Sequence, residues 1–379
     1  MLLLSGPNIA GNEWKYIKDC LDTGWVSSVG SYVDQFEKMT AEFAGTKYAV
    51  ATSSGTTALH IALLLAGVKN DDYVIAPNIT FVATCNSIKY TGADPILIDA
   101  DLHSWQMDLD LLEEFLREHT KQIKDECIYK RNNRRIRALV PVHVLGNICD
   151  MDRLMDLATK YNLIVIEDST ESLGSYFKTK HAGSFGLFGT FSYNGNKIIT
   201  TGGGGMIVTN DENLAKKAKH LTTQAKSDTF EYKHDEIGYN YRLINIAAAM
   251  GVAQMEQLPL FLKKKYQIIE YYKKELEVFG DIKFQKISDD VSPNWWLPTL
   301  MTRKQKVILE TLNNDNIQSR PFWVPMNKLP MFKDCIYFHR SDFSDFIYNN
   351  CVSIPCSTNI TDIQLQKVCD KIKKIYELL

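Results

Sequence analysis

Long apolar runs are missing from this 379-residue chain. No segment approaches the roughly 18 to 20 consecutive apolar residues that a bilayer-spanning helix requires. The three leucines at positions 2–4 are too few for the core of a secretion signal, and no basic segment precedes them. We therefore expect a protein that stays in the cytoplasm and does not bind a membrane.

Recognisable metal-binding spacings are also missing. The chain has eight cysteines but no Cys-x-x-Cys pair, and its histidines show no His-Glu-x-x-His pattern. These absences argue against a structural zinc site and against a catalytic metal. Scattered cysteines in a large unexported chain are predicted to be reduced thiols.

An excess of basic charge is the third absence. The formal net charge is -2, so the sequence gives no basic surface for nucleic acid. Hydrophobic residues make up 45% and charged residues 23%, which is an ordinary globular balance without disordered tracts. The length predicts two domains, which we place at residues 1–250 and 251–379.

Helical and strand patterns alternate along the first two thirds of the chain, which predicts an α/β fold with a doubly wound, mainly parallel sheet. The C-terminal part, begun by a long helix, mixes both kinds of element and predicts a smaller α+β domain. Pro259 is expected to kink or interrupt the start of that helix. The helices are predicted at residues 14–21, 33–43, 57–66, 81–90, 109–119, 151–161, 255–276, 304–313 and 362–379, and the strands at 47–51, 73–76, 95–99, 138–142, 163–166 and 295–301.

A Ser-Ser-Gly-Thr-Thr turn at residues 53–57 joins a predicted strand to a predicted helix. Backbone N–H groups at a helix start bind phosphate, and Gly55 would let a ligand approach the backbone closely. The same turn could be an ordinary helix cap.

Two carboxylates, Glu167 and Asp168, end the predicted strand at residues 163–166. Ligands of open α/β sheets bind at this end of the strands. An aspartate there could hold a pyridinium nitrogen in its protonated form, which makes a pyridoxal ring an electron sink. A helix cap and a magnesium ligand are the alternatives.

Lys197 lies between an apolar strand and four consecutive glycines, residues 202–205. A buried lysine loses its charge readily and becomes nucleophilic toward aldehydes. Most lysines are solvated surface residues instead. The glycines indicate unusual backbone conformations or close packing beside Lys197, which argues against a surface lysine.

These pieces occur in the order that is typical of fold-type I enzymes of pyridoxal phosphate. The chain resembles the DegT/DnrJ/StrS family of sugar-nucleotide aminotransferases. The matching segments run from residue 24 to residue 242: residues 24–28, 54–59, 80–84, 141–143, 167–168, 192–197, 201–205 and 238–242.

The resemblance implies an aspartate aminotransferase-like large domain with a seven-stranded type of sheet. It implies a role in cofactor binding for each matched residue. Gly55, Thr56 and Ser192 would bind the phosphate, Phe81 would stack on the ring, and Asp168 would face the ring nitrogen. Glu171 would lie near the ring. Lys197 would form the Schiff base, with pyridoxamine phosphate as the other cofactor form. Asn240 would reach the phosphate of a neighbouring subunit, which implies a homodimer with a shared site. Without the resemblance, Phe81 would be interpreted as a core residue and Asn240 as a loop residue.

The implied reaction is amine transfer from L-glutamate to C4 of a nucleotide-linked 4-keto-6-deoxy sugar for bacterial surface glycans. The segments at 12–17, 20–25 and 326–332 are most similar to the branch that acts on UDP-2-acetamido-2,6-dideoxyhexos-4-ulose in legionaminic acid pathways. GDP-perosamine synthase is the alternative. A sugar dehydratase and a catalytically silent relative also remain open, although a lysine at 197, where dehydratases have histidine, favours transamination.

Three further residues are candidates for shaping the sugar-nucleotide cleft. They are Trp295, Trp296 and Arg320. Core packing is an equally good interpretation of the two tryptophans, and Arg320 could be an ordinary salt-bridge residue.

Overall fold

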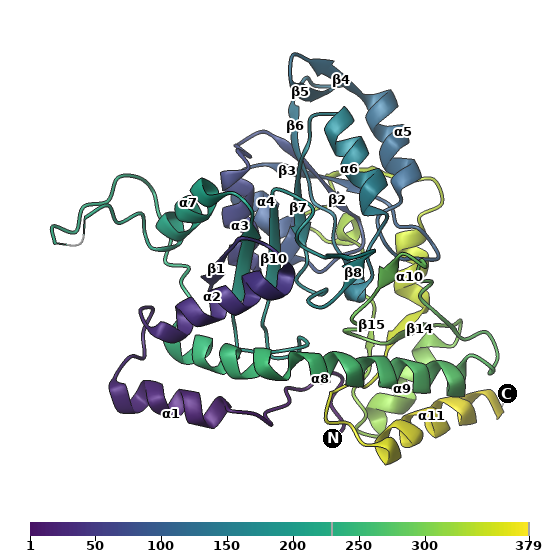
Figure 1. Cartoon of the computed structure of the whole chain (residues 1–379). Coiled ribbons are helices and arrows are strands. Elements are labelled where there is room, and N and C mark those ends of the chain that lie inside the picture. Colours follow the sequence, from purple (N-terminus) through teal and green to yellow (C-terminus); the bar gives the residue numbers. More distant parts are fainter. Residues whose placement is uncertain (229, 378–379) are drawn as a thin grey trace.

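A large twisted sheet runs through the computed structural model, which describes residues 1–228 and 230–377 (Figure 1). Its main path follows the strand order β1-β11-β10-β7-β6-β2-β3-β16, and the hairpin β4–β5 pairs with β6 through β5. The strands are β1 (Tyr48–Thr52), β2 (Tyr73–Pro77), β3 (Asp94–Ile98), β4 (Thr120–Ile123), β5 (Glu126–Tyr129), β6 (Arg135–Leu139), β7 (Ile164–Asp168), β10 (Phe188–Ser192), β11 (Gly205–Thr209) and β16 (Ile336–Phe338).

The sheet is mainly parallel, as predicted. Every neighbouring pair from β10 to β16 is parallel, whereas β11 is antiparallel to both β1 and β10. Seven strands, from β1 to β3 along the path, form the expected sheet. The structure adds β16 and the hairpin β4–β5.

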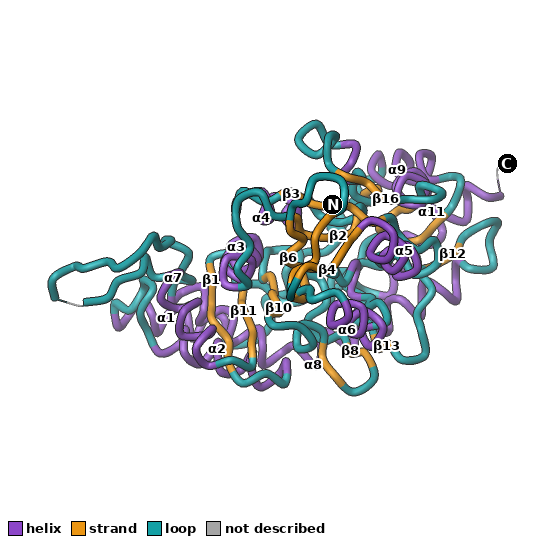
Figure 2. The backbone as a smooth tube through the Cα atoms, turned by 90° about the horizontal axis from the view of Figure 1, so that it is seen from above, coloured by secondary structure: helices purple, strands orange, loops and turns teal. Residues whose placement is uncertain are grey.

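Helices cover both faces of this sheet. Figure 2 shows the strands between α3 and α4 on one side and α2 and α6 on the other. Separate apolar cores fill the two faces, one under α3 and α7 and the others under α2, α5, α6 and α8, so the strands are buried on both sides. The helices are α1 (Glu13–Thr23), α2 (Ser31–Ala44), α3 (Gly55–Leu65), α4 (Ala83–Tyr90), α5 (Leu109–His119), α6 (Met151–Lys160), α7 (Glu212–Thr222) and α8 (Asn245–Leu276).

The long helix differs from its prediction. α8 begins at Asn245, ten residues earlier than expected, and Pro259 lies inside it without interrupting it (Figure 1). The first turns of α8 carry small and apolar residues on every side because they are packed against α1 and α2. An all-round apolar segment has no helical period to detect, which is why the prediction began too late.

A smaller antiparallel sheet follows, with the strand order β12-β14-β17-β15. Its elements are β12 (Lys283–Phe284), β14 (Thr299–Met301), β15 (Arg320–Pro321), β17 (Cys351–Ser353), α9 (Gln305–Asn314), α10 (Phe343–Asn350) and α11 (Asp362–Glu377). The last two residues predicted for the final helix lie outside the described part. A third small sheet joins β13 (Val291–Ser292) to β8 (Tyr176–Phe177) and β9 (Lys180–His181). The C-terminal part thus returns to the large sheet through β16, and a domain boundary at residue 250 stays a prediction.

Two further findings concern the whole described chain. All eight cysteines are free of disulfide bonds. Among residues 1–228 and 230–377, no helix combines the length and the apolar character needed to cross a membrane.

Candidate active site

The predicted site residues meet at one edge of the large sheet. Strands β7 and β10 end there, helix α3 begins there, and the loop after β10 carries Lys197. They surround a cavity of about 310 Å³. Of the predicted residues, those that line it are Gly55, Thr56, Phe81, Asp168, Glu171, Ser192, Lys197, Trp296 and Arg320.

The start of α3 forms a cradle with room for a phosphate. Ser54 caps the helix by accepting from the N–H of Thr57, which leaves the N–H groups of Gly55 and Thr56 facing the cavity end of the helix. A Cβ at Gly55 would lie 2.9 Å from Thr170 Cγ2 and 3.0 Å from Ser192 Cβ. Ser192 lines the cavity beside this turn. The turn is therefore both a helix cap and an anion cradle, because capping uses Ser54 and leaves the next two N–H groups available.

Gly55→Ala should weaken binding of a phosphate-bearing cofactor. The added methyl group would be overpacked between Thr170 and Ser192, at a cost of ~1–3 kcal/mol, or a ~5- to 150-fold higher Kd. Titration of the cofactor-free protein with pyridoxal phosphate measures this. Gly195→Ala is the matched control, because a Cβ there meets nothing within 4 Å. Equal affinities of the two variants would show that the α3 turn does not hold the phosphate.

Asp168 presents its carboxylate to the cavity and is fixed on both oxygens. Oδ2 accepts from the hydroxyl of Thr84 at 2.7 Å, and Oδ1 accepts from the hydroxyl of Thr170 at 2.7 Å and from its N–H at 3.2 Å. The side chain of Phe81 is 53% exposed and lines the same cavity, so it is not a core residue. An aromatic face and a fixed carboxylate thus share one side of the cavity.

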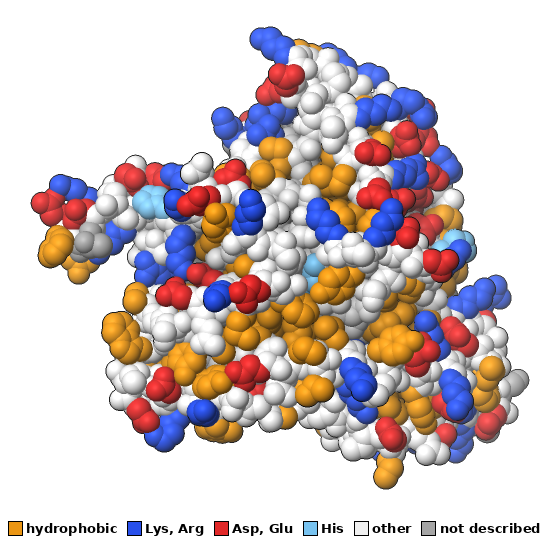
Figure 3. Space-filling view, in the orientation of Figure 1, with side chains coloured by type: hydrophobic (Ala, Val, Ile, Leu, Met, Phe, Trp, Pro, Cys, Tyr) orange, Lys and Arg blue, Asp and Glu red, His pale blue; other side chains and the backbone are white. Residues whose placement is uncertain are grey.

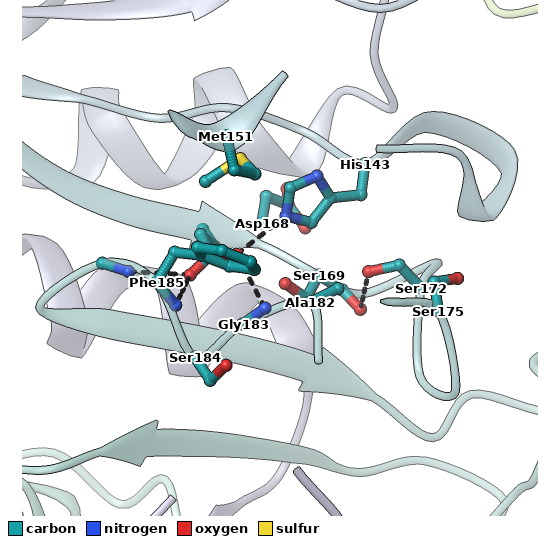
Figure 4. A network of polar contacts seen from close by, with 12 residues as sticks. His143, Met151, Asp168, Ser169, Ser172, Ser175, Ala182, Gly183, Ser184 and Phe185 are labelled. Carbon is teal, nitrogen blue, oxygen red and sulfur yellow. Dashed lines mark hydrogen bonds and ion pairs between the residues drawn. The ribbon is translucent and has the colours of Figure 1, made fainter. Parts of the chain in front are cut away.

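Glu167 points to the other face of strand β7, away from the cavity. Its Oε2 lies 2.9 Å from His143 Nε2 and accepts from the N–H of Gly183, while Oε1 accepts from the N–H groups of Phe185 and Gly186. Figure 4 shows this network beside Asp168. Burial raises the pKa of Glu167, but His143 and the backbone donors outweigh burial and hold the pKa below its ordinary value. Because adjacent strand residues face opposite ways, Glu167 and Asp168 cannot share a magnesium ion.

Lys197 is partly buried, with its amine in the cavity. Removal from water lowers the pKa of this amine, whereas the nearby charges of Glu171 and Asp168 raise it. The net direction is downward, which favours the neutral, nucleophilic amine. The amine lies 3.7 Å from the ring centroid of Trp296. The structure therefore places Lys197 in the environment that the glycine run suggested.

Glu171 is buried beside Lys197. Its Oε2 accepts from the N–H of Leu145 at 2.8 Å. Burial raises the pKa of Glu171 to about 7, against the opposing charge of Lys197. Glu171 can therefore exchange a proton near neutral pH beside the Lys197 amine.

Of the remaining predicted residues, some line the cavity and others lie outside it. Trp296 and Arg320 line the cavity, but Trp295 does not, and its ring lies 4.5 Å below the amine of Lys273 instead. The expectation that Trp295 shapes the cleft is not met by this placement. Asn240 is exposed and lies outside the cavity of its own chain, paired with Thr223. The contact of Asn240 with the cofactor phosphate of a neighbouring subunit stays a prediction.

Several cavity residues were missed at the sequence level. Thr84 and Thr170 fix Asp168, and Trp323 stacks on Trp296 with ring centroids 6.3 Å apart. Thr170 follows Asp168 by two residues, the spacing of a side-chain-to-backbone turn, and this could have been noticed. Nothing in the local pattern marks Trp323.

A surface group outside the cavity has the composition of a cation site. His220, Asp235 and Glu236 bring one ligand atom each to within 4.8 Å of the others. Lys217 also contacts Glu236, which supplies a positive charge without any metal. The predicted absence of a metal stays a prediction.

The comparisons with known proteins agree with this geometry. Residues 7–373 match the DegT/DnrJ/EryC1/StrS aminotransferase family. The chain is 37% identical over 373 residues to the GDP-perosamine synthase of Escherichia coli O157:H7, covering 98% of this chain and 97% of that one. It is 32% identical to a UDP-4-amino-4,6-dideoxy-N-acetyl-beta-L-altrosamine transaminase of Campylobacter jejuni, covering 96% and 95%. The Helicobacter pylori aminotransferase PseC has the same fold, with a TM-score of 0.89, 24% identity and full coverage of both chains.

The fold and the site define a pyridoxal phosphate-dependent aminotransferase of fold type I. The chain belongs to the DegT/DnrJ/EryC1/StrS aminotransferase family, a family of sugar-nucleotide aminotransferases. The predicted family, enzyme class and cofactor are confirmed.

Proposed function

We propose that this enzyme moves the amino group of L-glutamate to C4 of a nucleotide-linked 4-keto-6-deoxy sugar. The observation that carries the proposal is a lysine amine, a fixed carboxylate and a phosphate cradle around one cavity. The relatives named above as a sugar-nucleotide synthase and a transaminase support the substrate class.

The residues present fit pyridoxal phosphate. The cradle at Gly55 accepts no Cβ, the face of Phe81 is exposed, and Asp168 is held in position to pair with a protonated ring nitrogen. We propose that Gly55, Thr56 and Ser192 bind the phosphate. When bound, the cofactor accepts the amino group and withdraws electrons from the donor carbon.

Lys197 then acts as the base and acid of the reaction. Its Nζ takes the proton from Cα of the amino donor, and its lowered pKa favours the neutral amine that this step requires. Two hydroxyls and a backbone N–H donate to the Asp168 carboxyl group and hold it in position to stabilise positive charge on the ring. Glu171 holds a second exchangeable proton beside Lys197.

The nucleotide has two candidates. The UDP-linked 2-acetamido sugar was the first prediction from the sequence. The second, GDP-4-keto-6-deoxymannose, is favoured by relatives of 37%, 35% and 34% identity that carry the name GDP-perosamine synthase. Location in the cytoplasm and a role in surface glycans or legionaminic acid synthesis stay proposals.

A substrate screen tests the reaction. The purified enzyme with pyridoxal phosphate and glutamate would be offered UDP-, GDP- and dTDP-linked 4-keto-6-deoxy sugars, with mass spectrometry of the products. We expect one nucleotide class to give an amino sugar and an equal amount of 2-oxoglutarate. Loss of water without consumption of glutamate would indicate a dehydratase instead, and no turnover of any sugar would support a silent relative.

We further propose a homodimer that completes each site with Asn240 of the other subunit. Large apolar side chains are exposed on α1, on the loop before α2 and on the segment between α7 and α8, whose tip projects from the molecule (Figures 1 and 3). Trp14 is 78% exposed, Phe230 91% and Ile237 83%. Such a collection of apolar side chains suits contact with a second copy.

Mixed dimers test the shared site. Asn240→Asp would place a carboxylate against the neighbour's cofactor phosphate, and Lys197→Ala removes the amine of its own chain. Each variant alone should be nearly inactive, whereas random mixing should restore ~25% of wild-type activity, because half of the dimers would hold one intact site. Failure of mixing to restore activity, or a monomer in light scattering, would contradict a shared site.

A further inference from the structure

Trp296 makes contact with the amine of Lys197 through the face of its indole ring. The lysine Nζ lies 3.7 Å from the ring centroid, within the range of a cation–π interaction. The ring itself is fixed at its edge, because its Nε1 donates to the backbone oxygen of Asn196 at 2.7 Å. Trp323 stacks on the same indole with an interplanar angle of 17°.

The backbone of Trp296 is fixed by three buried side chains. Asn294 Oδ1 accepts from the N–H of Trp296 at 2.9 Å, and Asn294 also donates to the backbone oxygens of Glu171 and Leu173. Lys265 of α8, only 1% exposed, donates to the oxygen of Trp296 at 2.8 Å and to Cys356 Sγ at 3.1 Å, and Cys356 Sγ lies 3.3 Å from the same oxygen. Because an unpartnered polar group is costly to bury, these contacts constrain the position of the Trp296 backbone.

We propose that Trp296 is a positioning residue whose indole face holds the free, protonated amine of Lys197, and that Lys265 helps to fix the backbone that carries this ring. The inference rests on the proposed function, in which this amine must be free while it carries the proton. It gives Trp296 a role toward the lysine rather than toward the sugar nucleotide.

The direction of the effect follows from the charges around the amine. Asp168, Glu171 and Arg320 also line the cavity, and the two carboxylates stabilise the ammonium form as the indole does. Removing the indole therefore lowers the pKa of Lys197 further, so that the neutral amine should appear at lower pH. A cation–π contact in a desolvated site corresponds to a shift of about one pH unit.

Competitive labelling of the full-length, cofactor-free protein measures this directly. Acetic anhydride acylates neutral amines, and the extent of acylation of the Lys197 peptide is read by mass spectrometry over a range of about pH 6 to 10. We expect Trp296→Leu to move the midpoint down by about one unit and Trp296→Phe, which keeps a ring face, to move it less. Lys265→Met, which keeps the length of the side chain, should also move it down by a smaller amount.

Trp295→Leu is the matched control. Trp295 is the adjacent buried tryptophan, but its ring contacts Lys273, so the Lys197 midpoint should stay at the wild-type value. Unchanged midpoints in both Trp296 variants, or an equal shift in Trp295→Leu, would overturn the proposal. If Trp296→Leu fails to fold, the midpoint of Trp296→Phe tests the proposal instead. A wild type that binds no pyridoxal phosphate would refute the proposed function and leave this labelling comparison intact.

Discussion

Replacement of Lys197 by alanine is expected to reduce transamination by ~10³- to 10⁴-fold, the range for removal of a positioned acid–base group. Among residues 1–228 and 230–377, this side chain supplies the one lysine amine that lines the cavity beside Asp168 and Glu171. The loss should appear in kcat, measured as 2-oxoglutarate formed from glutamate. The visible absorption band of covalently held cofactor should be absent as well.

The control for this variant is Lys216→Ala on the surface of α7. That lysine is 71% exposed and pairs with Glu212 one turn away. Its removal should leave kcat within error, since exposed pairs contribute little. If Lys197→Ala kept more than a tenth of wild-type activity, another base would have to carry the proton.

Asp168→Asn is expected to lower kcat by ~10²- to 10³-fold, as removal of one electrostatic stabiliser of a reacting centre does. The variant keeps the shape of the side chain and an oxygen for the Thr84 hydroxyl, but it loses the charge that pairs with a protonated ring nitrogen. Because the cofactor's phosphate and ring contacts remain, cofactor content should stay near the wild-type level. Steady-state kinetics and a cofactor titration separate the two effects.

Glu167→Gln gives the contrasting outcome, because that carboxylate faces away from the cavity. Removing a buried acceptor oxygen leaves its donors unsatisfied at a cost of ~1–3 kcal/mol, so the free energy of unfolding should fall while kcat of the folded enzyme is retained. The folded-state pKa of Glu167 is depressed, so its contribution is present above the ordinary carboxyl pKa and is lost as pH falls. Urea unfolding at neutral and acid pH should show a smaller pH dependence in Glu167→Gln than in the wild type. A large kcat loss in this variant but not in Asp168→Asn would reverse the two assignments.

Much of the fold follows from local patterns. The alternation of strands with amphipathic helices such as α5 and α6 predicts the layered sheet, because these elements bury one stripe each. The start of α8 and the strand β16 could not be predicted from local sequence patterns. The residues that open α8 are small or apolar on every side and so show no helical period, and β16 is a three-residue strand that pairs with β3 from more than 230 positions away.

The site residues also fall into those that local sequence patterns predict and those that they do not. Gly55, Asp168 and Lys197 each lie in a short segment whose residue types suggest their chemistry. The choice between Trp295 and Trp296 could not be made, because only the folded backbone decides which of two adjacent rings faces the cavity. At Trp295 that backbone is left-handed, with φ at 53°. The Thr84–Asp168 bond joins residues 84 positions apart, a distance at which no local pattern operates.

The attachment point of the cofactor tests the central claim most directly. Borohydride reduction of the enzyme loaded with pyridoxal phosphate, followed by digestion and peptide mass spectrometry, locates the modified lysine. We predict one pyridoxyl group per chain, on the peptide that contains Lys197. Modification of a different lysine, such as the buried Lys265, or no modification at all, would contradict the account.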